Sequence, residues 1–221
     1  MKILEGDLRG KTDWDFIELK MSIDVPALNN WYNTVKEQHA NLKFNFSMSH
    51  LLKKDTINSS YKDILSPGIH SYGLSWPAQQ TLPIPPRYAA NPNLYPETTL
   101  PHEDFEKNMK IMDQYKFGYF NHLLAELGED TFAWSRITVH DAGASILPHN
   151  DGFGTIRLHI PITTNNQAWF NWGEKKYNFV PGKVYLINTY AEHHTSNDGT
   201  TERTHIISHP TNVAWLLENL S

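Results

Sequence analysis

Residues 155–162 read TIRLHIPI, and this stretch decides the fold class. Its side chains alternate strictly, so one face of the predicted strand is aliphatic, with Ile156, Leu158, Ile160 and Ile162. The other face carries Arg157 and His159. Burying such a pair on the inner side of a sheet is costly unless the two residues serve a ligand. The stretch therefore predicts a strand with one face directed at a binding site.

Five similar runs accompany this stretch. They are short, rich in β-branched and aromatic residues, and bounded by Gly, Asn and Pro: Ala133–His140, Ala168–Trp172, Tyr177–Val180, Lys183–Thr189 and Arg203–His209. The turn at Gly173, Glu174 and Lys175 indicates a hairpin between two of them. Six short strands predict an antiparallel sandwich or barrel.

The residues before this β region predict helices and one long loop. Between Asp24 and His39 apolar residues recur at helical spacing, which predicts a short amphipathic helix. From His102 to Leu127 a wide apolar face, followed by Gly128 at the C-cap position, predicts a longer scaffold helix. The segment Ser66–Pro101 lacks helical periodicity and holds eight of the 13 prolines. It predicts an ordered loop, either a lid over a site or a segment draped over the core.

The length of 221 residues fits a single domain, in which residues 1–130 supply helical and proline-rich support for a β core at 131–210. The absence of cysteine excludes disulfides, thiol catalysis and Cys-ligated metals, so any metal must be held by His and carboxylate.

The charge balance gives no reason to expect a nucleic-acid partner, because 19 Lys and Arg face 24 Asp and Glu without a basic stripe. The first ten residues, MKILEGDLRG, lack the apolar centre of a signal peptide, and no run of about 18 apolar residues occurs. We therefore expect a cytoplasmic protein without a membrane partner.

A metal site is the chemistry that the sequence predicts. His149 and Asp151 stand at i and i+2, so on extended chain they point to the same side. That pattern alone means little, but His193 follows 42 residues after Asp151 (193 − 151), far enough to return on a neighbouring strand. Two histidines and one carboxylate occupy one face of a metal and leave three positions open, as in non-haem Fe(II) oxygenases. A zinc hydrolase is also compatible with these ligands.

A carboxylate anchor is predicted beside the metal. Arg203 opens the last strand ten residues after His193 (203 − 193), where its guanidinium can bind a carboxylate through two parallel hydrogen bonds. Arg203 could instead form an ordinary ion pair with Glu192 or Glu202.

Three further alternatives stay open in the sequence. His194 competes with His193, because adjacent strand residues face opposite sides. His149 and Asp151 could belong to a solvated turn beside Pro148 and Gly152. His205 and His209 share the parity of Arg203 and could line the same cavity or be structural, whereas we take His140-Asp141 as a surface pair or a neighbour of the site.

Together these residues resemble the aspartyl/asparaginyl β-hydroxylase family of Fe(II)/2-oxoglutarate dioxygenases, to which bacterial free-proline hydroxylases are related. The resemblance rests on His149-Asn150-Asp151, Arg157-Leu158-His159-Ile160-Pro161-Ile162, Glu192-His193, Asn197 and Arg203, and covers roughly Thr131 to Pro210. It implies a mainly β protein with N-terminal helices, built on a double-stranded β-helix, or cupin-like jelly roll.

The resemblance also implies the role of each residue. His149, Asp151 and His193 would be the iron ligands, and Arg203 would bind the distal carboxylate of 2-oxoglutarate with the Thr138 hydroxyl beside it. Arg157 and His159 match the family's Arg-x-His, which lies near the co-substrate and the substrate carboxylate, so we assign them to binding.

The activity so implied is hydroxylation of an unactivated C–H bond in an amino acid, free or in a peptide, with Fe(II), 2-oxoglutarate and O2. Animal peptide hydroxylases of the family have glycine in place of the carboxylate ligand, whereas this chain keeps Asp151 and so resembles the bacterial members with small substrates. The complete triad also argues against halogenation. The alternatives are a non-catalytic cupin-type module that binds a metal and a small acid, or a zinc or manganese hydrolase or isomerase that uses the same triad.

Overall fold

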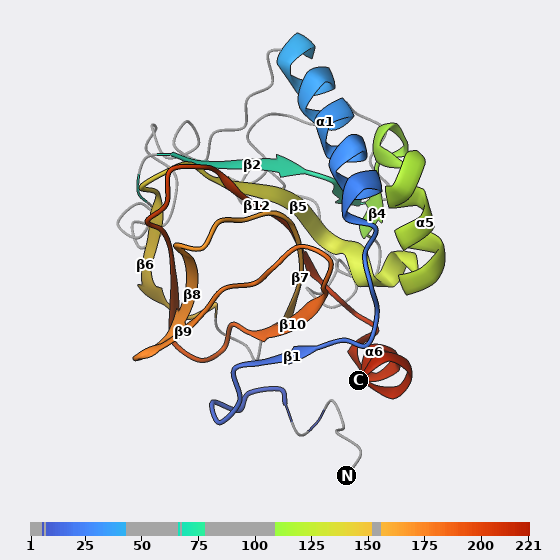
Figure 1. Ribbon diagram of the computed structural model, residues 1–221. Coiled ribbons are helices and arrows are strands. Elements are labelled where there is room, and N and C mark those ends of the chain that lie inside the picture. Colours follow the sequence, from blue (N-terminus) through green and yellow to red (C-terminus); the bar gives the residue numbers. More distant parts are fainter. Residues whose placement is uncertain (1–5, 7, 43–65, 67, 78–108, 152–155) are drawn as a thin grey trace, which may run out of the picture.

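The computed structural model describes residues 6, 8–42, 66, 68–77, 109–151 and 156–221 of the chain. Within these residues two antiparallel sheets face each other and enclose a barrel (Figure 1). The barrel strands are β5 (Ala133–His140), β6 (Ser145–His149), β7 (Ile156–Thr163), β8 (Ala168–Trp172), β9 (Lys175–Tyr177), β10 (Tyr185–Asn188), β11 (His193–Asn197) and β12 (Arg203–His209).

The strand order identifies the fold. Two strands from the N-terminal half, β1 (Phe16–Glu18) and β2 (Ile69–Gly73), form the edges of the larger sheet, whose order is β1-β10-β7-β12-β5-β2. The smaller sheet has the order β6-β11-β8-β9. Along the chain the barrel strands alternate between the two sheets, except at the β8–β9 hairpin, where Gly173 has a φ of 56°. This is the double-stranded β-helix, so the predicted fold class is confirmed.

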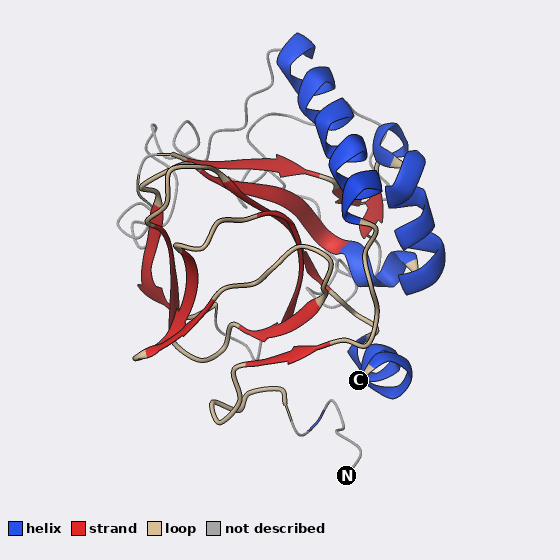
Figure 2. Ribbon diagram, viewed as in Figure 1, coloured by secondary structure: helices blue, strands red, loops and turns tan. Residues whose placement is uncertain are grey.

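Helices cover the outer face of the larger sheet (Figure 2). In α1 (Val25–Leu42) and α5 (Gly118–Leu127), apolar side chains pack onto the aliphatic residues that point outward from β5, β7 and β12. Trp31 of α1 stacks on Phe120 of α5, with ring centroids 4.5 Å apart. The predicted helix between Asp24 and His39 is confirmed, because its apolar stripe is the surface that covers the sheet.

The predicted helix over His102–Leu127 is wrong in its described N-terminal part. Met109–Ile111 forms strand β4, which pairs with β3 (Ser75–Pro77), and Asp113–Tyr115 is a 3-10 helix. The helix begins only at Gly118, which has a φ of 54° and follows the extended Phe117. The physical reason is a local period of two: Met109 and Ile111 are buried, whereas Lys110 points outward to Glu129. Residues 102–108 lie outside the described part.

The predicted loop over Ser66–Pro101 is also wrong where it is described, since β2 and β3 lie within it. β2 extends the larger sheet by pairing with β5, with Ser71 opposite Thr138. The remainder of the expected lid, residues 78–101, lies outside the described residues.

Several β predictions need correction. β6 and β11 were not predicted, because β6 contains Pro148 at the edge of its sheet and β11 reads HHTSN, which lacks apolar alternation. The run Tyr177–Val180 is not a strand. β9 instead covers Lys175–Tyr177, because the tight turn brings Lys175 directly opposite Trp172. A terminal helix, α6 (Val213–Leu220), was also missed.

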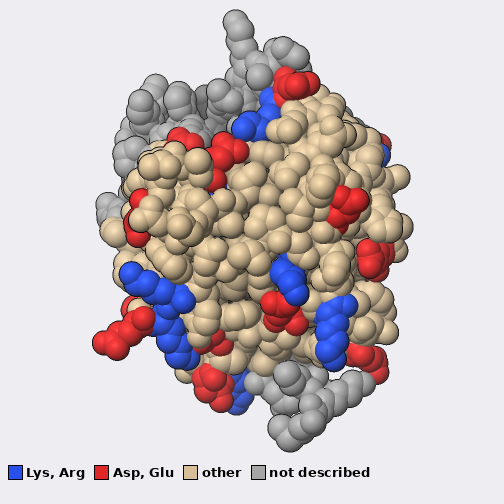
Figure 3. Space-filling model, viewed as in Figure 1, with Lys and Arg blue, Asp and Glu red and all other residues tan. Residues whose placement is uncertain are grey.

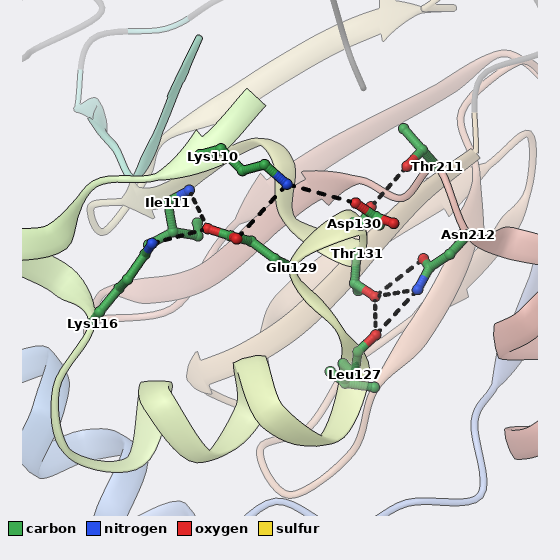
Figure 4. Close-up of polar contacts among 9 residues, drawn as sticks. All are labelled: Lys110, Ile111, Lys116, Leu127, Glu129, Asp130, Thr131, Thr211 and Asn212. Atoms are coloured by element: carbon green, nitrogen blue, oxygen red, sulfur yellow. Dashed lines mark hydrogen bonds and ion pairs between the residues drawn. The ribbon is translucent and has the colours of Figure 1, made fainter. Parts of the chain in front are cut away.

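A polar junction ties the outer elements to the start of β5 (Figure 4). Glu129, in the 3-10 helix η5 (Glu129–Phe132), accepts a hydrogen bond from the backbone N–H of Ile111 at 3.1 Å and forms an ion pair with Lys116 at 3.1 Å. The Thr131 hydroxyl donates to the carbonyl of Leu127 at 2.6 Å and also contacts Asn212. These contacts fix the corner where α5 ends and the barrel begins.

The surface shows charges of both signs. Acidic and basic side chains are interspersed on the face seen in Figure 3, and Lys175 and Lys183 pair with Asp15 and Glu18 at 2.7 and 2.6 Å. Among the helices described, none is both long and apolar enough to span a membrane.

The helix layer generates a stability prediction. Phe120→Ala removes a fully buried ring that stacks on Trp31 and touches Phe132, so the free energy of unfolding should fall by about 3–5 kcal/mol. Urea unfolding followed by circular dichroism measures this. Glu126→Ala on the exposed side of the same helix is the control and should change stability by less than about 0.5 kcal/mol. A loss at Phe120 no larger than at Glu126 would contradict the packing described here.

Candidate metal centre

The two sheets bring His149, Asp151 and His193 together at one end of the barrel. His149 ends β6 and His193 begins β11, where the two residues are direct partners across the ladder. Their ring centroids lie 4.3 Å apart. The backbone N–H of Asp151 donates to the carbonyl of Thr189, just after β10, at 2.8 Å. One potential ligand atom from each of the three residues lies within 4.8 Å of the others.

Backbone carbonyls orient both imidazoles. His149 Nδ1 lies 2.7 Å from the carbonyl of Leu147, and His193 Nδ1 lies 3.0 Å from the carbonyl of Ala191. A carbonyl can only accept, so each Nδ1 carries a proton, and Nε2 is the nitrogen that each ring has left for a metal. Histidine ligands of metals are commonly fixed in this way.

The structure distinguishes His193 from the competing His194. His193 is buried and lies with His149 and Asp151 in the cluster that could hold a metal, whereas His194 pairs with Asn171 of β8 and is absent from this cluster. His149 lies in a strand, and the side chains of His149 and Asp151 are 17% and 10% exposed, which does not fit a solvated turn.

Asp151 forms a close ion pair with Arg157 of the same chain. Its Oδ2 lies 2.5 Å from Nε of Arg157, and Arg157 also donates through Nη1 to Nε2 of His209. Burial alone would raise the pKa of Asp151, but the Arg157 guanidinium outweighs it and holds the pKa well below the usual 3.8. The carboxylate is therefore ionised at every physiological pH. Its other oxygen, Oδ1, is 3.8 Å from Nε2 of His149.

The surroundings of His193 favour its neutral form. Burial lowers its pKa to about 4, and the neighbouring His149 adds to this effect. A neutral imidazole is the form that binds a metal.

Arg203 is a buried cation inside the barrel. Its side chain begins β12 on the inner face of the larger sheet, directly opposite His140, and only 3% of the residue is exposed. Burial lowers its pKa to about 10, which still leaves it charged at neutral pH. Its hydrogen bonds go to Nε2 of His140 at 3.5 Å and Nδ1 of His205 at 3.3 Å.

The structure brings no carboxylate of the described residues into an ion pair with Arg203. The two glutamates considered as partners lie elsewhere: Glu202 contacts Lys36 and Tyr32, and Glu192 is exposed. Thr138 lies opposite His205, two residues along the ladder from the Arg203–His140 pair, and its buried hydroxyl has no hydrogen-bond partner in the described part of the chain. The predicted pairing of a hydroxyl with this arginine is thus compatible with the strand register.

His159 lies on the same inner face and is buried. Its Nδ1 is 3.3 Å from Nδ1 of His205, and its ring meets the edge of Phe170 with centroids 5.8 Å apart. Arg157, by contrast, lies at the metal end of β7, on Asp151. The assignment of these two residues to co-substrate or substrate binding remains a prediction.

The sequence-based interpretation missed part of the inner surface. His140 is only 1% exposed, so of its two interpretations the surface pair is wrong, whereas a neighbour of the site agrees with its contact with Arg203. Strand alternation places it on the same face as Thr138. Phe170 stacks on His193 with centroids 5.1 Å apart and separates the metal centre from His159. The sequence pattern that could have identified His140 is its position two residues after Thr138 on β5, which places both side chains on the same face.

Comparisons with known proteins agree with the predicted family. A family model described as Aspartyl/Asparaginyl beta-hydroxylase matches residues 104–210, just under half of the chain. The resemblance inferred from the sequence is thereby confirmed over this segment. A search of curated proteins found no match.

Solved structures give distant similarities. A Pseudomonas putida prolyl-4-hydroxylase is 9% identical with a TM-score of 0.43, over 92% of this chain and 94% of that chain. An oxidoreductase of the 2OG-Fe(II) oxygenase family from Burkholderia pseudomallei is 12% identical with a TM-score of 0.35, over 63% and 65%. A predicted oxalate decarboxylase from Thermotoga maritima is 13% identical with a TM-score of 0.30, over 44% and 73%. Because these TM-scores are low, the fold assignment rests on strand order.

The triad geometry predicts which residues bind a divalent metal. We expect His149→Ala, Asp151→Ala and His193→Ala each to lower the affinity for Mn(II) or Co(II) at least about 100-fold, because each removes one of three ligands. Isothermal titration calorimetry measures this. His194→Ala is the matched control, since it removes the adjacent imidazole, and it should bind the metal like the wild type. Equal losses at His193 and His194 would refute the assignment.

The inner histidines predict a pH dependence of stability. Burial, with a further contribution from Arg203, holds the pKa values of His140, His159 and His205 well below 6.5. Below about pH 6.5 the unfolded chain therefore binds more protons than the folded chain, and stability falls as the pH drops. Each histidine contributes a slope of up to about 1.4 kcal/mol per pH unit.

Urea unfolding at a series of pH values from 7.5 to about 5 tests this expectation. His205→Gln should remove one such contribution from the slope, while His122→Gln, on the exposed face of α5, should leave the slope unchanged. A wild-type stability that does not vary over this range would show that the buried histidines are not held neutral.

Proposed function

We propose that this chain, whose residues 104–210 match the aspartyl/asparaginyl β-hydroxylase family, is an Fe(II)- and 2-oxoglutarate-dependent oxygenase. Its reaction would be the hydroxylation of an unactivated C–H bond in an amino acid, free or within a peptide. The observation that carries the proposal is the combination of a His-Asp-His cluster and a buried arginine without a carboxylate partner among the described residues, inside one barrel.

The residues present fit Fe(II). Two imidazoles and one carboxylate are the donor set typical of non-haem iron oxygenases, and three ligands from one side leave positions for a co-substrate and oxygen. His149 and His193 would hold the ion through Nε2, and Asp151 through Oδ1, the oxygen that Arg157 does not bind. The contact with Arg157 would keep Asp151 charged and fixed in direction.

The residues present also fit a dicarboxylate. A guanidinium that is almost fully buried is costly without an anion, and a ligand carboxylate would satisfy both Arg203 and the Thr138 hydroxyl. When bound, Fe(II) and 2-oxoglutarate supply the oxygen activation that no side chain can provide. The chain itself would bind and orient these groups, and the apolar rings of Phe170 and Trp172 would help to exclude water from the interior.

The retained Asp151 supports a small substrate, because the resemblance associates a full triad with the bacterial members. Screening the twenty amino acids and short peptides by mass spectrometry for the gain of one oxygen atom would identify the substrate class. Consumption of 2-oxoglutarate in air that requires added Fe(II) tests the reaction type. Silence in this assay together with tight zinc binding would favour a hydrolase that uses the same triad.

Arg203 gives the sharpest prediction for this function. Arg203→Ala should raise the 2-oxoglutarate concentration needed for half-maximal turnover at least about 30-fold, since removing one partner of a buried charge pair costs about 2 kcal/mol or more. Lys36→Ala is the control: it removes a cation that contacts Glu202, next to Arg203 in sequence, and should leave this requirement unchanged. An unaltered requirement in Arg203→Ala would remove the residue from co-substrate binding.

A further inference from the structure

Two buried histidines flank Arg203 on the inner face of the barrel. His140 of β5 lies opposite Arg203, and His205 follows Arg203 by two residues on β12. The two histidines are 1% and 0% exposed, and neither has a carboxylate within ion-pair distance among the residues described. The metal ligands are His149, Asp151 and His193, so this pair is a separate cluster.

The hydrogen bonds of Arg203 determine where the protons of both histidines lie. A guanidinium has only donors, so His140 must accept at Nε2 and His205 must accept at Nδ1. Each imidazole is neutral and therefore carries its one proton on the other nitrogen. These nitrogens are Nδ1 of His140 and Nε2 of His205.

Both of these N–H groups are buried and have no hydrogen-bond partner among the residues that the structure describes, and the same is true of the Thr138 hydroxyl. A buried polar group without a partner costs about 1–3 kcal/mol, so native interiors contain few of them. These three groups come from two paired strands, and two of them belong to rings that contact the buried Arg203. Together they indicate that an acceptor from a bound ligand completes them.

Two side chains, Phe170 and His159, connect the cluster to the metal centre. His193 stacks on Phe170, Phe170 meets His159, and His159 contacts His205 with ring centroids 5.5 Å apart. A ligand that binds the metal and passes along Phe170 would therefore end between His140, His205 and Arg203.

We propose that His140 and His205 bind the far carboxylate of the co-substrate directly, as neutral N–H donors on either side of Arg203. The inference rests on the proposed function, because it takes 2-oxoglutarate as the ligand. A carboxylate has about four lone-pair sites, which suits two imidazole N–H groups, one hydroxyl and a guanidinium. Burial keeps both histidines neutral, so Arg203 carries the only positive charge of the cradle, as a single carboxylate requires.

Binding measurements on the Mn(II)-loaded protein without oxygen test this inference independently of turnover. His140→Leu and His205→Leu remove the N–H groups and should each weaken 2-oxoglutarate binding by about tenfold or more. His140→Asn keeps a donor at the Nδ1 position and His205→Gln keeps one at the Nε2 position, so these variants should stay within about threefold of the wild type. Isothermal titration calorimetry gives the affinities, and Mn(II) affinity reports on the fold.

Two controls separate a direct contact from a structural effect. Ser135→Ala removes a buried hydroxyl, also without a partner, from the opposite face of β5, and it should not change the affinity for 2-oxoglutarate. The second ligand is 2-oxobutanoate, which lacks the far carboxylate: the leucine variants should bind it as the wild type does.

The outcomes are distinct. Leucine variants that retain full affinity for 2-oxoglutarate, or that lose affinity for both oxo acids equally, would overturn the role of His140 and His205 while leaving the proposed function intact. A Mn(II)-loaded wild type that does not bind 2-oxoglutarate would overturn the proposed function and this inference with it.

Discussion

The pairing of β12 with β5 sets the chemistry of the barrel interior. It puts Arg203 opposite His140 and His205 opposite Thr138, and it turns Ile206 and Ile137 outward to the helices. Because side chains alternate along a strand, a shift of one residue in this register would move the guanidinium into the helix interface and an isoleucine into the cavity. The same strand register therefore determines both the polar inner face and the apolar outer face of the larger sheet.

The apolar packing on the outer face of the larger sheet offsets the unfavourable free energy of burying polar and charged side chains on its inner face. Inside the larger sheet lie arginines and histidines whose burial is unfavourable without a ligand, whereas on the outside the same strands bury aliphatic residues against Trp31 and Phe120. Each large apolar side chain so buried contributes about 1.5–3 kcal/mol. The N-terminal helices thus support the site energetically, although neither α1 nor α5 supplies a residue to the His-Asp-His cluster.

Much of the core was predictable because its strands alternate. TIRLHIPI identifies β7, and Arg203 with its alternating neighbours identifies β12. β6 and β11 were not recognised, because pairing with neighbouring strands, rather than a pattern of side chains, stabilises their extended conformation. The direct pairing of His149 with His193 arises only in the folded structure. The segment from Met109 to Phe117 misled for the opposite reason: its apolar residues fit a helical stripe, but partners in β3 stabilise an extended conformation. The roles of His140 and of Phe170 depend on neighbours far apart in sequence, which composition and spacing do not encode.

Two of the inward arginines, Arg157 and Arg203, differ in where their anion comes from. Arg157 has Asp151 supplied by the chain, and that pair keeps one member of the His-Asp-His cluster ionised and oriented. Among the described residues Arg203 contacts only imidazoles, which are acceptors without charge, and in the proposed function its counter-ion is a ligand carboxylate. A cation satisfied by the fold stabilises the site before anything binds, whereas a cation left unsatisfied contributes its interaction energy only when a carboxylate arrives. In the proposed function this difference would let Arg157 support the Asp151 carboxylate and leave Arg203 to recognise a ligand, even though the sequence presents both simply as arginines on inward faces of strands.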